Sequence, residues 1–323
     1  AFMEAGRLDD AREAFEKYVP NRGAGAQGQH RYWWRIIHLS EIHRRNDVPK
    51  LALQALDEIT DYYGSDTYRA PITLERAAIA YDTGDEEQAL AEYESVLLLL
   101  SDPASPDYAS ALYGKGRVYQ DRWARAMDDA TLTDEQRRAV LDDARVVWEN
   151  LAFKLDPKGG DPRLAEALYL AGIAHLEGGE YAKARDYLER IGPAREAARS
   201  KDLTPEEQAE WTSTELRAAH ALAESFFLDG RYADAIPMYE AAIALDNDSP
   251  EIALAHHQLG LCWFRLDDFA AARRNWEIGR ARVNAMSDEQ LAELPVRQDK
   301  AFWLQLYDEK IAALDEPERL RKP

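Results

Sequence analysis

Alanines and bulky apolar residues recur along this chain at fixed distances from a turn residue. The phrase GRLDDAREAFEKY begins at Gly6, and close variants of it begin at Gly84, Gly179, Gly230 and Asp267. In each copy an alanine stands five residues after the turn and a bulky apolar residue stands nine after it. Side chains four residues apart lie on one face of a helix, so each copy predicts an amphipathic helix that begins just after the turn. The alanines are Ala11, Ala89, Ala184, Ala235 and Ala272, and the bulky residues are Phe15, Tyr93, Leu188, Tyr239 and Trp276.

A second pattern precedes three of these turns and predicts another helix there. Each such helix has a small residue in its middle, followed three residues later by an aromatic residue or a histidine. Glycine inside a helix costs about 1 kcal/mol relative to alanine, so we expect close packing against the following helix at this point. The two patterns together make one helix-turn-helix unit. The small residues and their followers are Gly172 and His175, Ala223 and Phe226, and Gly260 and Trp263.

This unit resembles the tetratricopeptide repeat, in which a small residue, aromatic residues and an alanine recur along two antiparallel helices. The resemblance implies an all-α fold: a right-handed superhelical solenoid of about seven helix-turn-helix repeats with a C-terminal capping helix. The turns at Gly230 and Asp267 lie about 37 residues apart, which is longer than the roughly 34 residues of the standard repeat. A degenerate copy has its turn at Asn46-Asp47, and a further copy is split by an insertion.

The repeats predict one domain over residues 1–286, with a truncated first repeat and an insertion near residues 121–143. Within the insertion, Thr133 and Gln136 match a capping box, so we expect a helix to begin there. Residues 287–323 are predicted to form the capping helix and a tail, because the end of a repeat array needs a polar outer face. The chain opens on what reads as the last turn of a helix. A signal peptide, a lipid anchor, further repeats or another domain before Ala1 are all compatible with that start.

The net charge of the chain favours some classes of binding partner and disfavours others. Forty Lys and Arg residues oppose sixty Asp and Glu residues, for a net charge of −20 at pH 7. This sign disfavours contacts with a phosphate backbone, so no nucleic acid is expected, and it favours a basic protein segment. No apolar run approaches the roughly eighteen residues of a transmembrane helix, so we expect no membrane span. The single cysteine, Cys262, excludes a disulfide within the chain and a metal site built from cysteines.

No catalytic or metal-binding pattern emerges from the sequence. Residues 23–28 spell G-x-G-x-x-G, but a dinucleotide site needs a preceding strand, and a helix is expected here. His256 and His257 are adjacent, so they point about 100° apart on a helix and do not readily share one ion. Residues 246–249 carry the oxygen ligands of a calcium loop without its glycine and its terminal Glu. No serine or cysteine stands in a nucleophile motif. We therefore predict that the chain is not an enzyme and has no catalytic residues, no cofactor and no metal site.

The resemblance to tetratricopeptide repeats also implies a function. In that family the first helices line a concave face, and repeated positions on them contact the partner. Some members grip a terminal carboxylate with Lys and Asn, whereas here His220 and Glu224 stand at such positions, which disfavours that mode. We expect a non-catalytic protein–protein interaction scaffold that binds a peptide or helix of a partner protein in its concave groove, in a bacterial multiprotein assembly. The expected partner-binding residues are Tyr113, Arg117, Tyr169, Ile173, Arg217, His220, Glu224, Phe227, His257, Phe264 and Arg265.

Two other functions remain open at this point. One is a sensor or adaptor fragment of a larger regulatory protein, in which a domain outside this chain performs catalysis or DNA binding. The other is binding of a glycan or small ligand in an aromatic pocket, which the eight tryptophans and sixteen tyrosines allow. The long repeat spacing resembles that of bacterial envelope tetratricopeptide proteins, such as outer-membrane assembly lipoproteins. This resemblance favours the periplasm or cell envelope, with the cytoplasm as the alternative.

Overall fold

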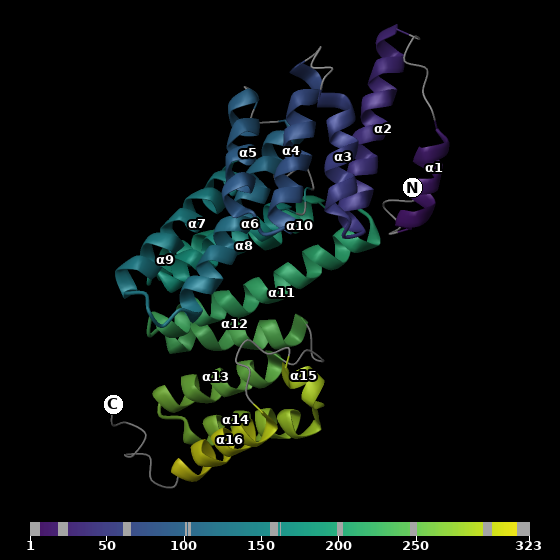
Figure 1. Cartoon of the computed structure of the whole chain (residues 1–323). Helices are drawn as coiled ribbons and strands as arrows, with labels where there is room; N and C mark the ends of the chain where they lie inside the picture. Colours follow the sequence, from purple (N-terminus) through teal and green to yellow (C-terminus); the bar gives the residue numbers. More distant parts are fainter. Residues whose placement is uncertain are drawn as a thin grey trace. The chain divides into compact units, whose positions relative to one another are not determined.

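A computed structural model describes residues 7–18, 25–60, 66–100, 102, 105–155, 161, 163–198, 203–245, 251–292 and 299–314 (Figure 1). Every regular element within these residues is a helix, which confirms the predicted all-α repeat fold. The chain divides into two compact units, unit 1 over Ala1–Leu155 and unit 2 over Asp156–Pro323. The predicted limit of the repeats at residue 286 stays a prediction.

Unit 1 consists of helix pairs whose members pack against each other and against the next pair. The pairs are α2 with α3, α4 with α5, and α6 with α7, and α1 packs on α2. The first helices α2, α4 and α6 also contact one another in that order. The bounds are α1 (Leu8–Lys17), α2 (Gly25–Arg45), α3 (Pro49–Thr60), α4 (Asp66–Asp82), α5 (Glu86–Leu99), α6 (Pro106–Asp128) and α7 (Asp134–Lys154).

Unit 2 follows the same plan, with one addition. Its pairs are α8 with α9, α11 with α12, and α13 with α14, and α16 packs on α14. The short α10, which the sequence patterns do not predict, packs on α8 and α11; Pro193 lies in its first turn, where a missing N–H is tolerated. The bounds are α8 (Arg163–Glu177), α9 (Tyr181–Leu188), α10 (Ile191–Ala198), α11 (Pro205–Leu228), α12 (Tyr232–Leu245), α13 (Glu251–Arg265), α14 (Phe269–Ala285), α15 (Asp288–Ala292) and α16 (Lys300–Ala313).

Five of the turns between paired helices place one residue in the left-handed backbone region, and the longer connection between α6 and α7 does not. Gly84, Gly179 and Gly230 have φ of 80°, 74° and 72°, and Asp47 and Asp267 have φ of 56° and 64°. A left-handed residue ends a helix while the chain reverses, and glycine adopts it without steric cost. The predicted turn residues within the described part of the chain therefore share one backbone conformation.

Helix starts in the long connections also follow the sequence. The Thr133 hydroxyl accepts a hydrogen bond from the backbone N–H of Gln136, and the Gln136 side-chain oxygen accepts one from the backbone N–H of Thr133. The same reciprocal arrangement joins Thr204 and Glu207 at the start of α11. The insertion near residues 121–143 thus lengthens α6 and α7, which end and begin at Asp128 and Asp134.

Small residues of first helices receive large side chains from second helices. Gly260 lies against the indole of Trp276, and Gly172 lies against Leu188. Gly116 meets Trp148 in unit 1 in the same way. The five repeated alanines are all buried, as the repeat pattern predicts. Each helix pair therefore packs through a notch on one helix and a bulky side chain on the other.

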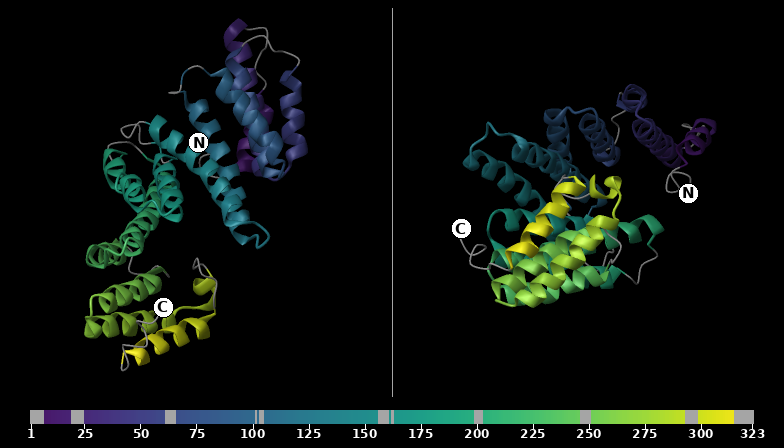
Figure 2. Two further views of the ribbon diagram at one scale, coloured as in Figure 1. Left: turned by 90° about the vertical axis from the view of Figure 1, so that its left-hand side faces the viewer. Right: turned by 90° about the horizontal axis from the view of Figure 1, so that it is seen from below.

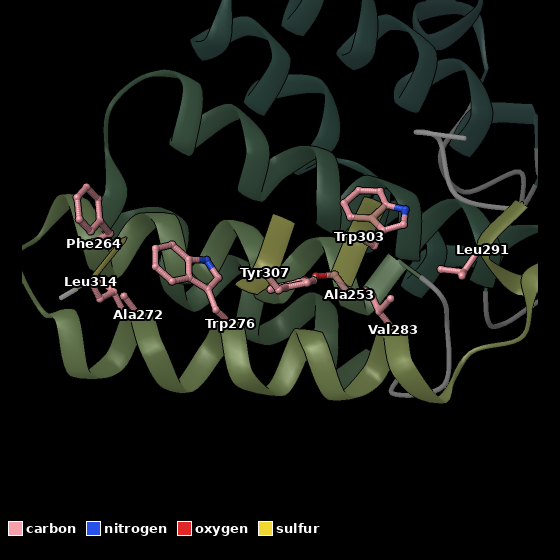
Figure 3. Close-up of a cluster of buried hydrophobic side chains, with 9 residues drawn as sticks. All are labelled: Ala253, Phe264, Ala272, Trp276, Val283, Leu291, Trp303, Tyr307 and Leu314. Carbon is pink, nitrogen blue, oxygen red and sulfur yellow. The ribbon is translucent and has the colours of Figure 1, made fainter. Parts of the chain in front are cut away.

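The C-terminal core of unit 2 gathers side chains from α13, α14, α15 and α16 (Figure 3). Trp303 and Tyr307 of α16 are buried against α14, and the Tyr307 hydroxyl donates a hydrogen bond to the carbonyl oxygen of Ala253. Viewed from other directions, α16 lies along α14 (Figure 2). Helix α16 therefore covers the apolar side of the last helix pair, as expected of a capping helix.

We expect Gly260→Ala to destabilise unit 2 by about 1–3 kcal/mol. An added Cβ overlaps the indole ring of Trp276, which is fully buried and hydrogen-bonded through Nε1 to the carbonyl oxygen of His257 at 3.0 Å. Urea unfolding followed by circular dichroism measures the change. Gly192→Ala is the control, because a Cβ at Gly192 meets no atom within 4 Å. Equal stabilities of the two variants would contradict the notch packing.

Candidate functional site

Unit 1 contains a groove of about 660 Å³ that crosses its three first helices. The lining residues recur every three or four positions on each helix, so each helix turns one face to the groove. The set includes Tyr93, which reaches the groove from α5. The α2 residues are His30, Trp34, Ile37, His38, Glu41 and Arg44, the α4 residues are Tyr68, Pro71, Leu74, Glu75 and Ala78, and the α6 residues are Asp107, Ser110, Tyr113, Gly114 and Arg117.

Aromatic side chains of the groove are held from behind by other rings. Trp34 is 48% exposed, and its ring lies 5.3 Å from that of Phe15 on α1. Tyr113 packs edge-on against Trp148 with ring centroids 5.8 Å apart. Tyr68 packs edge-on against Trp33 at 4.4 Å. These contacts fix the rings before any partner binds.

A network of ion pairs joins α2 to α4 near the C-terminal end of α2. Arg44 of α2 donates from Nε to Glu75 at 2.9 Å and from a terminal nitrogen to Asp82 at 2.8 Å, both on α4. Glu75 is only 8% exposed. Burial raises the pKa of Glu75 to about 7, while the neighbouring Arg44 guanidinium acts in the opposite direction. These ion pairs hold α2 against α4. Because Arg44, Glu75 and Asp82 neutralise one another, little of their charge is available to a ligand.

A second set of contacts joins α4 to α6. The Tyr81 hydroxyl donates a hydrogen bond of 2.5 Å to Asp121, and the Arg117 guanidinium lies 4.7 Å from the centre of the Tyr81 ring. Burial and the Asp121 carboxylate together raise the pKa of Tyr81 to about 12, so it stays a donor at neutral pH. Polar contacts thus join the three first helices of unit 1 to one another, and Arg44, Glu75 and Arg117 among them line the groove.

Two residues expected to contact a partner, Tyr113 and Arg117, do line this groove. The sequence patterns missed Trp34, Tyr68 and Asp107, which line it from α2, α4 and α6. Groove positions were transferred to α6 and to first helices of unit 2, and not to α2 and α4. Counting back thirteen residues from the turn at Asp47, the distance from Gly230 to Arg217, reaches Trp34. Tyr68 and Asp107 each lie three residues before the first such position of their helix, so this count does not find them.

In unit 2 the structure brings some of the expected residues together. The Arg217 guanidinium of α11 lies 4.7 Å from the centre of the Tyr169 ring on α8. Glu224 accepts hydrogen bonds from the Tyr239 hydroxyl at 2.8 Å and from the Gln258 amide at 3.4 Å. Burial raises the pKa of Glu224, and these two hydrogen bonds oppose the shift.

The side chains of the other expected partner-binding residues of unit 2 differ in solvent exposure. Ile173 and His220 are half-buried, and Arg265 is exposed. Phe227 is half-buried and packs edge-on against Tyr232 with ring centroids 5.5 Å apart.

Phe264 does not lie on the surface where the repeat positions put it. It is 4% exposed, and its ring packs 5.6 Å from Phe269 and 6.3 Å from Trp276 in the core of α13 and α14 (Figure 3). Its place near the end of α13 turns it towards the partner helix α14 rather than outward. We therefore remove Phe264 from the candidate contacts.

His257 also packs inward in part, since it meets the Tyr307 ring edge-on at 5.8 Å. Burial lowers the pKa of His257 to about 4, and the positive charge of Lys310 adds to that shift. The imidazole is therefore neutral at pH 7 and contributes packing surface rather than charge.

The described residues offer no arrangement of side chains suited to metal binding. No group of three or more His, Cys, Asp or Glu side chains among them is placed to hold a metal ion. Burial raises the pKa of the Cys262 thiol to about 12, so it is protonated at neutral pH. None of the helices in the described ranges combines the length and apolarity that crossing a bilayer requires. Residues 25–28 of the G-x-G-x-x-G segment belong to α2, whereas residues 23–24 and the 246–249 turn lie outside the described residues.

Two segments of the chain match known family models. Residues 220–277, from α11 to α14, and residues 166–192, which include α8 and α9, each match a model of the tetratricopeptide repeat. No curated protein matches the chain at a significant level.

Several solved structures are similar in fold. MamA from Desulfovibrio magneticus RS-1 is 18% identical, and the match covers 68% of this chain and 97% of that one with a TM-score of 0.46. YrrB, described as a TPR protein with an unusual peptide-binding site, is 16% identical over 71% of this chain and 92% of that one, with a TM-score of 0.46. A tetratricopeptide repeat protein from Parabacteroides merdae is 14% identical over 97% and 94%, with a TM-score of 0.41. At these identities the similarity concerns the fold alone.

We expect acidification to destabilise unit 2 through His257. Its pKa is about 4 in the folded chain and about 6.5 when exposed, so the unfolded state binds a proton first as pH falls. The stabilisation is complete above pH 6.5 and is lost between about pH 6.5 and 4, at a cost of up to about 3 kcal/mol. Unfolding free energies measured across this range should fall less steeply for His257→Gln than for the parent chain. His30→Gln, the same substitution at an exposed histidine of unit 1, is the control for the substitution itself.

Proposed function

We propose, from the premise that this chain is a tetratricopeptide repeat protein, that it is a non-catalytic scaffold whose unit 1 groove binds a peptide or helical segment of another protein. The observation that carries this proposal is the groove itself, a volume of about 660 Å³ lined by three successive first helices. A groove that crosses several helices suits an elongated chain, because each helix adds one row of contacts along its length.

The aromatic residues of the groove suit the role of anchors. A few large, well-packed aromatic side chains supply most of the binding energy at protein interfaces. Trp34 offers an exposed ring whose other side already packs on Phe15 and on His38, 4.3 Å away edge-on. Because these rings are already immobilised by their neighbours, this chain loses less side-chain entropy when a partner binds.

Electrostatics favours a basic partner segment. The net charge of −20 attracts positively charged segments and raises their rate of encounter. The effect weakens as salt is added, because exposed charges are screened over about 10 Å at 0.1 M ionic strength.

Unit 2 carries a second proposed contact surface. Tyr169 and Arg217 form a stacked pair on neighbouring first helices, and Ile173 and His220 lie on the same two helices. Arginine over tyrosine is a frequent element of interfaces, since the pair is both apolar and hydrogen-bonding. Glu224, Phe227, His257 and Arg265 extend this proposed surface along α11 and α13.

A photo-crosslinking amino acid in place of Trp34 tests the proposal. Irradiation in a native lysate should produce one defined adduct through position 34, because the partner passes over this side chain. The same crosslinker in place of Phe153 is the control, since Phe153 is 81% exposed in the same unit but does not line the groove. Mass spectrometry identifies the adduct and the crosslinked segment.

Competition makes the crosslinking result specific. An excess of the unmodified chain should suppress the adduct, whereas an excess of a Trp34→Ala, Tyr113→Ala double variant should suppress it at least tenfold less well, by about 1.4 kcal/mol. Circular dichroism confirms that the variant is folded. An adduct that forms equally from position 153, or that both competitors suppress alike, would rule out the groove as the binding site.

A further inference from the structure

One end of the unit 1 groove combines aromatic rings with a carboxylate. Tyr68, near the start of α4, forms a hydrogen bond with His30 and packs edge-on against Trp33, both on α2. Trp34, the next residue, lines the groove with its exposed ring. Tyr68 and Trp34 therefore stand at the same level of α2 and α4.

The register of α4 and α6 places Asp107 at this level too. The hydrogen bond between Tyr81 and Asp121 pairs the C-terminal halves of these two helices. Both are first helices and run in the same direction, because each lies antiparallel to α5 between them; Glu86 at the start of α5 pairs with Arg122 late in α6. Tyr68 stands thirteen residues before Tyr81 on α4. Thirteen residues before Asp121 on α6 stands Tyr108, the neighbour of Asp107. Asp107 itself lines the groove.

The carboxylate of Asp107 differs from the other charged groups of the groove. Each of those already has a partner inside unit 1, whereas Asp107 has no ion pair among the residues that the structure describes. It is half-buried, and this burial raises its pKa. Losing water without gaining a counter-charge is unfavourable, so a cation at this position is stabilised. The partnered groups are Arg44 with Glu75 and Asp82, Glu41 with His38 and Arg45, and Arg117 with the Tyr81 ring.

We propose that Asp107, together with the rings of Trp34 and Tyr68, binds a lysine or arginine side chain of the partner segment. This inference rests on the proposed function of the groove and names the residue type that it selects. The carboxylate accepts a charge-assisted hydrogen bond from the cation, and the rings contribute cation–π attraction and cover its methylene groups. Unit 1 already uses this chemistry within itself, where Arg117 lies over Tyr81 and Lys115 lies 5.9 Å from the Tyr119 ring.

Fluorescence anisotropy with the full chain tests the inference. The probes are a labelled amphipathic peptide of Leu, Ala and Lys, and the same peptide with Glu in place of Lys. Asp107→Asn should raise the Kd of the Lys peptide about tenfold, because it removes the charge and keeps the shape. Asp107→Lys should weaken that peptide further and should improve binding of the Glu peptide.

Asp143→Asn and Asp143→Lys are the matched controls. Asp143 is an exposed residue of α7 that does not line the groove, so these variants change the net charge equally. Trp34→Ala reports whether the peptide occupies the groove. If Trp34→Ala weakens the Lys peptide while Asp107→Asn does not, or if both aspartate sites have equal effects, the cation site is refuted and groove binding stands. If the Lys peptide does not bind, or binds without regard to Trp34, both proposals fail.

Discussion

The insertion of a bulky side chain of a second helix into a notch on the first helix is the contact on which the rest of this structure depends. Trp276 against Gly260, Trp148 against Gly116 and Leu188 against Gly172 are three instances of it. Neither helix of a pair can bury its apolar face alone, and the notch lets the two backbones approach closely. In α8 with α9 and in α13 with α14 the turn residue stands at the same distance from the notch and from the inserted side chain, so these pairs close in similar geometry, and α6 with α7 makes the same contact across a longer connection. Repetition of that geometry sets the first helices side by side.

The groove in unit 1 is a consequence of this arrangement. Three first helices in contact present three parallel rows of side chains, and their large residues point partly inward to the pair and partly outward to the groove. Trp148 is fully buried and holds Tyr113 from behind, whereas Trp34 keeps nearly half of its surface. The same residue type is therefore buried in the core or exposed in the groove according to its position on the helix.

Polar contacts between first helices give the groove its rigidity and its charge pattern. The Arg44 pairs with Glu75 and Asp82, and the Tyr81 contacts with Asp121 and Arg117, consume most of the charge that faces the groove. Burying a carboxylate such as Glu75 is costly, and its arginine neighbour offsets part of that cost. What remains for a ligand is a set of preformed aromatic rings and one carboxylate, Asp107, with no internal counter-charge among the described residues.

Residue spacing along the chain was enough to predict the helix pairs, their turns, the buried alanines and the capping boxes, because all of these depend on residues within one or two turns of a helix. The resemblance to tetratricopeptide repeats singled out Tyr113 and Arg117, and both line the groove. Residue spacing could not predict how exposed a given aromatic side chain is. Phe264 and Trp34 look alike in a helical pattern, and they differ in which neighbouring helix covers them. That Asp107, Tyr68 and Trp34 line one groove was equally impossible to predict from residue spacing. It follows from the register of three helices, and that register is set by side chains far apart in sequence that touch only once the pairs have stacked.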